Sequence, residues 1–419
     1  MGYNTWYDME CTELMEHNMV RLTADLFVLN GLAALGYEFI NLDDCYISHV
    51  GRVNGTLHPD EARFGGVAGI KDLADYVHSK GLKFGLYTDR GTKTCAGLAA
   101  AQGHEAVDAQ TYADWGVDYL KEDSCNAPDD EATAIVQYGL MRDALNATGR
   151  PIFFSTCGWH EWYAPPNATL NYTGGHSLAN AARIGPDDTN WKGVLINTDV
   201  MAVVNQYARP GYWNDPCLLL SKDAQGNLRV TELQSRAQFA LWCVMSAPLL
   251  ISGSLSLMSA YTLATYSNRQ AIAINQADGW SPGSQWSQLR TAGRRLAGTD
   301  LSSAECGDKP ATGAVCVNAW GKALTLTSWA LLLLNAGSAP LDVSCGAACL
   351  GEMNIHALHF PLNATDVYAG PLPAITSPTV VAKALPAMGG FVLLVLNTTN
   401  ADVTNAHAAA HGVVGVVEA

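Results

Sequence analysis

The segment Tyr119-Leu-Lys-Glu-Asp-Ser-Cys125 has the pattern of a short strand whose side chains alternate between two faces. Lys121 and Asp123 therefore share one face, and Glu122 points to the other. An ammonium group beside a carboxylate, near the end of a strand, keeps an aspartate ionised and nucleophilic. An isolated Lys-x-Asp is more often a structural ion pair, so the neighbouring strands decide between the two interpretations.

Two further predicted strands end in polar residues, Phe39-Ile-Asn-Leu-Asp-Asp-Cys45 and Lys83-Phe-Gly-Leu-Tyr-Thr-Asp89. Between them, Leu73, Tyr76 and Val77 have the i, i+3, i+4 spacing of a helix. Three strands that end in this way and alternate with helices indicate an enzyme.

The alternation of strands and helices continues to about residue 253. Helices are predicted from Asp108, as N-cap, to Trp115 and at 135–145 and 231–245, and strands at 151–157, 211–215 and 248–253. Such repeated units indicate an α/β protein with a parallel sheet covered by helices. A doubly wound sheet usually has a glycine-rich loop after its first strand, and none follows Gly2–Trp6. The pattern therefore favours a closed eight-stranded β/α (TIM) barrel over residues 1–282.

The pattern changes in the Gly-, Ser- and Pro-containing segment from Ala277 to Gln288. Short alternating runs such as Ala323–Ser328 and Phe391–Leu396 follow, separated by Gly, Pro and Asn. They predict a small C-terminal antiparallel β-sandwich domain over residues 283–419.

The composition excludes some partners and suggests a compartment. A net charge of −15 and a pI near 5.0 argue against binding to nucleic acid or to an anionic membrane. The apolar run Ala330–Leu334 is too short to span a bilayer. Six Asn-x-Ser/Thr sequons predict a glycoprotein, at Asn54, Asn146, Asn167, Asn171, Asn363 and Asn397.

Eleven cysteines agree with a secreted or vacuolar/lysosomal protein. Cys306 with Cys316, and Cys345 with Cys349, have the spacing of disulfides that close small loops. Because eleven is odd, at least one cysteine must remain a free thiol within the chain. Cys243, in an apolar helical run, is the favoured candidate. No Cys-x-x-Cys or His-x-His pair indicates a metal site. No signal peptide is expected in this chain, because the first predicted strand starts at Gly2.

Six motifs resemble those of the family 27 glycoside hydrolases, which include α-galactosidases and α-N-acetylgalactosaminidases. The motifs occur in the family's order over residues 2 to about 276 and are Gly2-Tyr-Asn-Thr-Trp6, Asn41-Leu-Asp-Asp-Cys45, Thr94-Cys-Ala-Gly97, Leu120-Lys-Glu-Asp-Ser-Cys125, Gly211-Tyr-Trp-Asn-Asp-Pro216 and Ala273-Ile-Asn-Gln276. The resemblance implies a retaining exo-glycosidase that uses two carboxylates and neither a metal nor another cofactor.

The resemblance also implies the role of each carboxylate. Asp123 would be the nucleophile, and Asp187, in Arg183-Ile-Gly-Pro-Asp187, the acid/base, with Arg183 orienting the sugar and the carboxylate. The family usually has a Trp five residues after its acid/base, whereas Trp191 is four residues after Asp187. Asp188 therefore stays an alternative, and an N-cap role suits either aspartate.

Sugar contacts are implied in the same way. Asp43 and Asp44 would accept hydrogen bonds from O4 and O6 of galactose, and Lys121 would reach O3 and O4. Trp6 and Tyr87 would form the apolar floor and wall of the pocket. The resemblance also places a disulfide between Cys95 and Cys125 against the pocket, and another between Cys11 and Cys45.

Two departures from the family pattern affect specificity. In the loop Cys157-Gly-Trp-His-Glu-Trp162, which the family uses to read the 2-position of the sugar, Gly158 is small, Trp159 follows, and Glu161 is charged. A charged Glu161 favours a 2-hydroxyl over a 2-acetamido group. Cys217 replaces a family Asp, and a disulfide between Cys217 and Cys157 is one interpretation of this change.

The sequence thus predicts an α-galactosidase that removes terminal α-linked galactose from oligosaccharides or glycoconjugates, with most activity at acidic pH. An α-N-acetylgalactosaminidase and a β-L-arabinopyranosidase are alternatives within the family, although the unchanged Asp43 disfavours the second. A sugar-binding barrel without activity is an alternative of another class. A metal-dependent hydrolase with Asp43 and Asp44 as ligands lacks the required histidines. Family members often dimerise, so a homodimer is a candidate assembly.

Overall fold

The computed structural model describes residues 1–158, 175–277, 294–296, 316–325 and 327–400. It contains two compact units. The first unit comprises Met1–Phe239 and Ala247–Ser267, and the second comprises Ala240–Ser246 and the described residues from Asn268 onward. The boundary expected near residue 282 lies in the segment 278–293, outside the described residues.

The first unit is built on one parallel sheet with the order β10-β11-β1-β2-β5-β6-β7-β8-β9. Its strands are β1 (Gly2–Asn4), β2 (Phe39–Asn41), β5 (Lys83–Asp89), β6 (Tyr119–Asp123), β7 (Phe153–Thr156), β8 (Ala181–Arg183), β9 (Trp213–Asp215), β10 (Leu219–Leu220) and β11 (Leu250–Ser252). The predicted parallel α/β architecture is confirmed. The sheet has nine hydrogen-bonded segments among the described residues, so the expected count of eight is not established.

The two edge strands of this sheet follow one another in the chain. Only three residues, Pro216 to Leu218, connect β9 to β10. Four peptide links extend at most about 14 Å, so the two edges of the sheet lie close together. The sheet therefore curls on itself in the manner of a β/α barrel.

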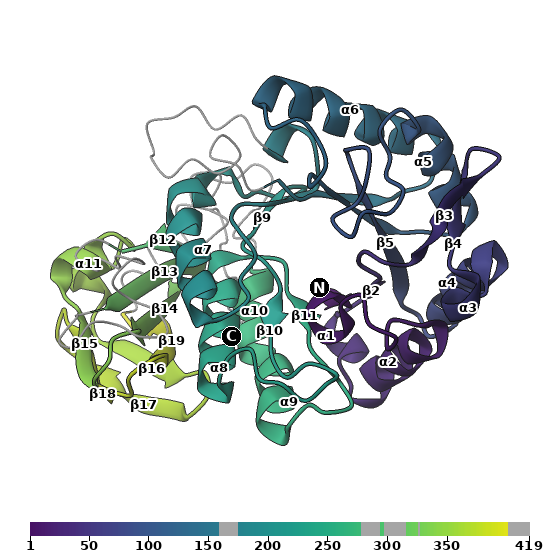
Figure 1. Ribbon diagram of the computed structural model, residues 1–419. Coiled ribbons are helices and arrows are strands. Elements are labelled where there is room, and N and C mark those ends of the chain that lie inside the picture. Colours follow the sequence, from purple (N-terminus) through teal and green to yellow (C-terminus); the bar gives the residue numbers. More distant parts are fainter. Residues whose placement is uncertain (159–174, 278–293, 297–315, 326, 401–419) are drawn as a thin grey trace, which may run out of the picture. The chain divides into compact units, whose positions relative to one another are not determined.

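Helices cover the outer side of the curved sheet, as α2, α4, α5 and α6 show in Figure 1. The helices of the chain up to residue 277 are α1 (Trp6–Met9), α2 (His17–Leu29), α3 (Glu61–Phe64), α4 (Gly66–Ser79), α5 (Glu105–Asp114), α6 (Glu131–Ala147), α7 (Trp191–Val204), α8 (Glu232–Met245), α9 (Ala260–Tyr266) and α10 (Arg269–Gln276). In α4, Ile70, Leu73, Ala74 and Val77 are fully buried, which is the apolar stripe that its spacing predicts.

Asp108 was expected to cap a helix, and this prediction is wrong. Helix α5 begins three residues earlier, and the Asp108 carboxylate is fully buried inside it. Arg52 on the hairpin β3 (Ile47–Val53) and β4 (Thr56–Pro59) donates one hydrogen bond to each carboxylate oxygen, both at 2.6 Å. The carboxylate thus pairs with a distant guanidinium instead of a local N–H group, which a local sequence pattern does not reveal.

The second unit contains the C-terminal antiparallel β domain. A six-stranded sheet has the order β12-β13-β14-β19-β16-β17, and β15 pairs with β18. Its elements are β12 (Arg294–Arg295), β13 (Val317–Thr325), β14 (Ser328–Asn335), β15 (Leu341–Cys345), α11 (Ala347–Gly351), β16 (Leu362–Asp366), β17 (Gly370–Ile375), β18 (Val380–Leu385) and β19 (Gly390–Thr398). One apolar core joins the two sheets, since Leu331 and Leu394 belong to the same cluster as Val343 and Val380. The run 323–328, predicted as one strand, contains the reversal between β13 and β14.

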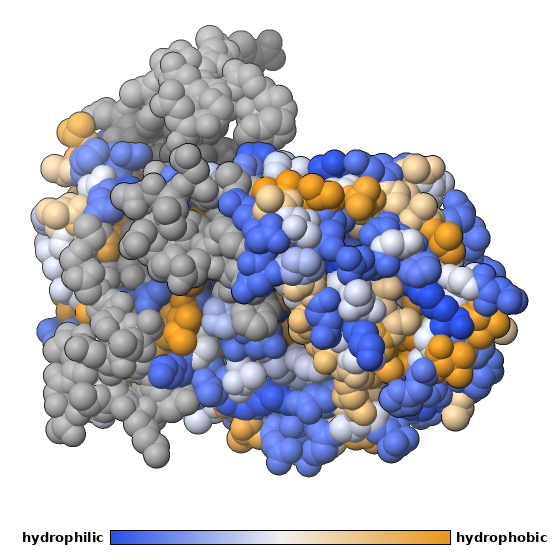
Figure 2. Space-filling model, turned by 45° about the horizontal axis from the view of Figure 1, so that its top comes forward, coloured by the Kyte–Doolittle hydropathy of each residue, from blue (hydrophilic) through white to orange (hydrophobic). Residues whose placement is uncertain are grey.

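On the face shown in Figure 2, hydrophilic and hydrophobic side chains of the described residues are mixed. Asn54, Asn146 and Asn363 are exposed and Asn397 is half-buried, so these four sequons are accessible to different degrees, while Asn167 and Asn171 lie outside the described residues. Within the described part of the chain, no helix is long and apolar enough to cross a membrane.

The Arg52–Asp108 pair generates a stability prediction. Asp108→Asn is expected to lower the free energy of unfolding by roughly 3 kcal/mol, because it leaves a largely buried guanidinium without its counter-charge. Urea unfolding of both proteins measures the difference. Asp143→Asn removes an exposed pair with Arg142 and is the matched control, with no measurable change expected. Equal stability of Asp108→Asn and the parent would contradict the assignment.

Candidate active site

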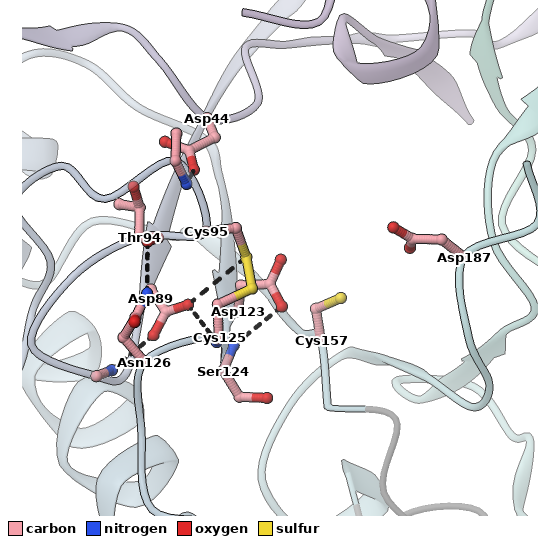
Figure 3. Close-up of a disulfide and its surroundings, with 12 residues drawn as sticks. Asp44, Asp89, Thr94, Cys95, Asp123, Ser124, Cys125, Asn126, Cys157 and Asp187 are labelled. Carbon is pink, nitrogen blue, oxygen red and sulfur yellow. Dashed lines mark hydrogen bonds between the residues drawn. A yellow bond between two sulfur atoms is a disulfide. The ribbon is translucent and has the colours of Figure 1, made fainter.

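The carboxyl ends of the parallel strands bring the predicted functional residues to one edge of the sheet. Asp43 and Asp44 follow β2, Lys121 and Asp123 lie on β6, and Arg183 ends β8. Four of them are buried, and the Lys121 side chain is 14 % exposed. Figure 3 shows Asp44, Asp123, Cys157 and Asp187 around the same opening, although they come from four different parts of the chain.

Asp123 is held at both oxygens. The Tyr87 hydroxyl donates to Oδ2 at 3.1 Å, and the Ser124 N–H donates to Oδ1 at 2.9 Å. The Lys121 ammonium lies 3.9 Å from Oδ2. Burial raises the pKa of Asp123, and Lys121 opposes this shift without outweighing it.

Lys121 has a closer partner than Asp123. Its Nζ donates to Asp43 Oδ2 at 2.8 Å, and Asn4 Nδ2 donates to the same oxygen at 2.8 Å. The main-chain N–H of Asp43 donates to Thr5 Oγ1 at 2.9 Å. Asp43, and not Asp123, is therefore the principal counter-charge of Lys121.

Asp44 is fixed by main-chain donors. The N–H groups of Cys45 and Ala96 donate to Oδ1 and Oδ2 at 2.7 and 2.8 Å. Burial raises the pKa of Asp44, and these hydrogen bonds partly oppose that effect. Disulfide bonds restrain the backbone next to both donors. One joins Cys45 to Cys11, and the other joins Cys95, which precedes Ala96, to Cys125.

The structure separates the two candidate acid/base residues. The Asp187 side chain is 49 % exposed and accepts a hydrogen bond from Arg183 Nη2 at 3.0 Å. In Figure 3 its carboxyl group points into the opening toward Asp123. Asp188 is 0 % exposed, and Gln238 Nε2 donates to its Oδ2 at 2.8 Å. A substrate can therefore reach Asp187, whereas Asp188 is shielded by the protein.

Buried contacts hold the turn that presents Asp187. Asn197 Nδ2 donates to the carbonyls of Pro186 and Pro216, both at 2.8 Å. A Cβ at Gly185 would lie 2.1 Å from Asn197 Oδ1, so this close approach requires glycine. Partial burial acts to raise the pKa of Asp187, but the charges of Arg183 and Lys121 outweigh it and hold that pKa below the usual range.

A disulfide between Cys157 and Cys217 was one interpretation of the sequence, and it is wrong. Both residues carry buried thiols. Cys157 follows β7 and Cys217 follows β9, with β8 between them. Strands two apart in a sheet are separated by about 9.6 Å, beyond the roughly 7 Å limit for bridged Cα atoms. Arg183 of β8 occupies this interval, with Nη1 at 3.8 Å from Cys157 Sγ.

The remaining predicted residues are those of the pocket and the other cysteines. Gly158 is buried and Trp6 is half-buried, while Trp159 and Glu161 lie outside the described residues. Cys345 is bonded to Cys349, and Cys243 is a buried thiol. Cys316 is disulfide-bonded, and its expected partner Cys306 lies outside the described residues.

Three buried residues around the site were given no role in the sequence analysis: Asn4, Asp89 and Glu122. Asp89 accepts hydrogen bonds from Gly91 N–H and Cys125 N–H, each at 2.7 Å. One of its oxygens lies within 4.8 Å of an Asp123 oxygen, and burial followed by the charge of Asp123 raises the pKa of Asp89 to about 7. The end of the predicted strand at Asp89 was the available signal.

Asp89 and Asp123 also lie near Cys95 and Cys125, a set of residue types that binds metals elsewhere. Here the two sulfur atoms are joined in a disulfide and are not thiolates. The four residues therefore do not fit a metal ion.

Comparison with known proteins agrees with this geometry. A family model described as Alpha galactosidase A matches residues 3–277. The chain belongs to this family, glycoside hydrolase family 27, and is a glycoside hydrolase. The expected family membership is thereby confirmed.

Individual relatives differ in name. The α-galactosidase A of Cellvibrio japonicus is 39 % identical over 287 residues, which cover 66 % of this chain and 67 % of the relative. The α-galactosidase of Cyamopsis tetragonoloba is 41 % identical over 278 residues, which cover 66 % of this chain and 64 % of the relative. The α-N-acetylgalactosaminidase of Gallus gallus is 37 % identical over 290 residues, which cover 66 % of this chain and 69 % of the relative. The matched segment spans about two thirds of each relative.

The fold extends beyond that segment. The crystal structure of α-galactosidase I from Mortierella vinacea aligns with a TM-score of 0.78 and 25 % identity. The alignment covers 96 % of this chain and 97 % of that one. The barrel and the C-terminal β domain are thus both similar to those of a family member.

Glu122 generates a prediction about pH and stability. It is fully buried, neither carboxylate oxygen has a hydrogen-bond partner in the described structure, and burial raises its pKa well above the usual range. The folded protein therefore binds this proton more tightly than the unfolded chain, so stability falls as the pH rises above about 4.5. Glu122→Met removes the titrating group and is expected to gain at least about 1.4 kcal/mol at pH 7.5, the equivalent of one pKa unit.

Thermal unfolding between pH 4 and 8 tests this prediction. The advantage of Glu122→Met should grow with pH, whereas substitution of the exposed Glu13 by Gln should leave the profile unchanged. Parallel profiles for Glu122→Met and the parent would show that Glu122 does not titrate with unfolding.

Proposed function

We propose that this protein is a retaining exo-α-galactosidase that hydrolyses terminal α-linked D-galactose from oligosaccharides or glycoconjugates. The observation that carries the proposal is the pairing of a buried, doubly hydrogen-bonded Asp123 with a half-exposed Asp187 that points toward it across the opening. The names of the relatives from Cellvibrio japonicus and Cyamopsis tetragonoloba support the substrate class.

The reaction would proceed in two steps. Asp123 attacks the anomeric carbon while Asp187 protonates the departing oxygen, which gives a galactosyl-enzyme and a free aglycone. Asp187, now ionised, takes a proton from water, and the oxygen of that water displaces Asp123. Tyr87 and Ser124 supply hydrogen bonds to the Asp123 carboxylate, so they orient it before attack.

Sugar recognition would come from the β2 side of the site. Asp43 and Asp44 offer carboxylate oxygens to sugar hydroxyls, and Lys121 offers an ammonium held against Asp43. Trp6 and Tyr87 provide apolar faces for the ring. Arg183 has its Nε buried without a hydrogen-bond partner in the described structure, so it retains a donor beside Asp187.

An α-N-acetylgalactosaminidase is the second candidate. The relative from Gallus gallus supports it, and the small, buried Gly158 leaves room near the loop that reads the 2-position. We retain galactose as the substrate because Glu161 is charged.

Three further proposals concern the whole protein. The barrel has eight strands, with β9 and β10 as two halves of one strand. The disulfides support a secreted or vacuolar/lysosomal location. A homodimer is the candidate assembly.

Proton NMR of p-nitrophenyl α-D-galactopyranoside hydrolysis tests the activity and the mechanism together. α-Galactose should appear before mutarotation, because two displacements retain configuration. Asp123→Asn should lower kcat on the order of 10³-fold or more. β-Galactose as the first product would exclude the mechanism, and turnover only of the 2-acetamido substrate would establish the second candidate.

The choice between Asp187 and Asp188 is tested by azide. Asp187→Ala should accumulate the galactosyl-enzyme from an activated aryl substrate, and azide should release it as α-galactosyl azide with restored turnover. Asp188→Ala should show no such rescue, since Asp188 is shielded from the opening. Rescue of Asp188→Ala alone would reverse the assignment.

The pH profile has a directional expectation. In the free protein the pKa of Asp187 lies below its usual range, yet a general acid must carry a proton. A bound sugar would cover the 49 % of the Asp187 side chain that is exposed, and loss of water raises a carboxyl pKa. The alkaline limb of kcat should therefore lie at higher pH than the alkaline limb of kcat/KM. Coincident limbs would contradict this explanation.

A further inference from the structure

Asn4, at the end of β1, connects two residues of the proposed sugar site. It is 2 % exposed. Its Nδ2 donates to Asp43 Oδ2 at 2.8 Å, and its Oδ1 accepts a hydrogen bond from the Trp6 N–H at 2.8 Å. These two neighbours fix the orientation of the amide, because a main-chain N–H can only donate and a carboxylate accepts.

The main chain around Asn4 is fixed independently. Its carbonyl accepts a hydrogen bond from Ser252 Oγ at 2.9 Å, and the Tyr7 N–H donates to the same hydroxyl at 2.8 Å. Parallel pairing also aligns Asn4 with Asn41, two residues before Asp43. The side-chain amide thus projects from a rigid support.

We propose that Asn4 is a positioning residue for sugar binding, which holds the Asp43 carboxylate and the Trp6 main chain in their binding arrangement. This inference rests on the proposed function, which assigns sugar binding to Asp43 and Trp6. The only side chains that the described structure places in hydrogen-bond contact with the Asp43 carboxylate are Asn4 and Lys121, both at Oδ2. Its other oxygen accepts the Asp44 N–H at 3.0 Å.

The arrangement requires an amide at this position. An ionised aspartate has no donor and would repel Asp43, while leucine has a similar size but neither donor nor acceptor. Loss of the Asn4 donor leaves Lys121 to hold Asp43 alone, although Lys121 also lies 3.9 Å from Asp123. Asp43 then has more rotamer freedom, and sugar binding must first order it.

Steady-state kinetics of Asn4→Leu and Asn4→Asp test the proposal on p-nitrophenyl α-D-galactopyranoside. Asn4→Leu should raise KM about tenfold or more at every pH, since a hydrogen bond to a charged group is lost. Asn4→Asp should raise KM similarly at pH 7.5 and approach the parent value near pH 4.5, because a protonated carboxyl group can again donate to Asp43. A purely structural role would instead lower the amount of active protein and leave KM unchanged.

Asn335→Asp is the matched control. Asn335 is 0 % exposed and lies in the second unit. Among the described residues, its Nδ2 donates only to the main-chain carbonyls of Ala339, Leu385 and Pro386. This change should leave KM and its pH dependence at the parent values, whatever it does to stability. A pH-dependent KM in the control would show that burial of a new carboxyl group alone causes the effect, and would overturn the proposal.

Calorimetric binding of D-galactose separates this proposal from the proposed function. If the parent binds galactose but hydrolyses no α-galactoside, the proposed function fails, and a tenfold weaker Kd for Asn4→Leu would still support the positioning role. KM and Kd within twofold of the parent for both Asn4 variants would overturn the positioning role while the function stands. A parent protein that neither binds nor hydrolyses would overturn both.

Discussion

The parallel pairing of β5 with β6 is the constraint on which the site depends. Its register places Tyr87 beside Lys121 and Asp89 beside Asp123. A hydroxyl donor thus reaches Asp123, and a second carboxyl group comes within 4.8 Å of it. A shift by one residue would turn Lys121 and Asp123 toward the helices and Glu122 toward the opening, because strand side chains alternate.

The neighbouring strands β2, β5 and β6 bring several buried carboxyl groups to the site. Asp44, Asp89, Glu122 and Asp123 all lie at the ends of neighbouring strands, and burial raises the pKa of each of them. Every one of these shifts favours the protonated form in the folded state, so each contributes a loss of stability as the pH rises. These four groups therefore favour the folded state more at acidic than at neutral pH.

Local periodicity was enough to predict part of the fold and of the site. Alternation along 119–125 placed Lys121 and Asp123 on one face, and the strand-helix repeats indicated the parallel barrel architecture. Contacts that only the strand order creates could not be predicted in this way. Asp108 pairs with Arg52, 56 residues away, and Asn4 reaches Asp43, 39 residues away. The Cys157–Cys217 interpretation failed for the same reason, since nothing local shows that β8 lies between the two cysteines.

Arg183, which donates a hydrogen bond to Asp187, lies near two buried thiols. Burial raises the pKa of Cys157 and of Cys217, so both stay neutral beside the Arg183 guanidinium. A carboxylate in place of the Cys217 thiol would compete with Asp187 for that positive charge. With a neutral thiol there, the described hydrogen bond between Arg183 and Asp187 joins the guanidinium to its nearest anion. The neutral Cys217 thiol thus leaves the charge of Arg183 to Asp187, which we propose as the acid/base group.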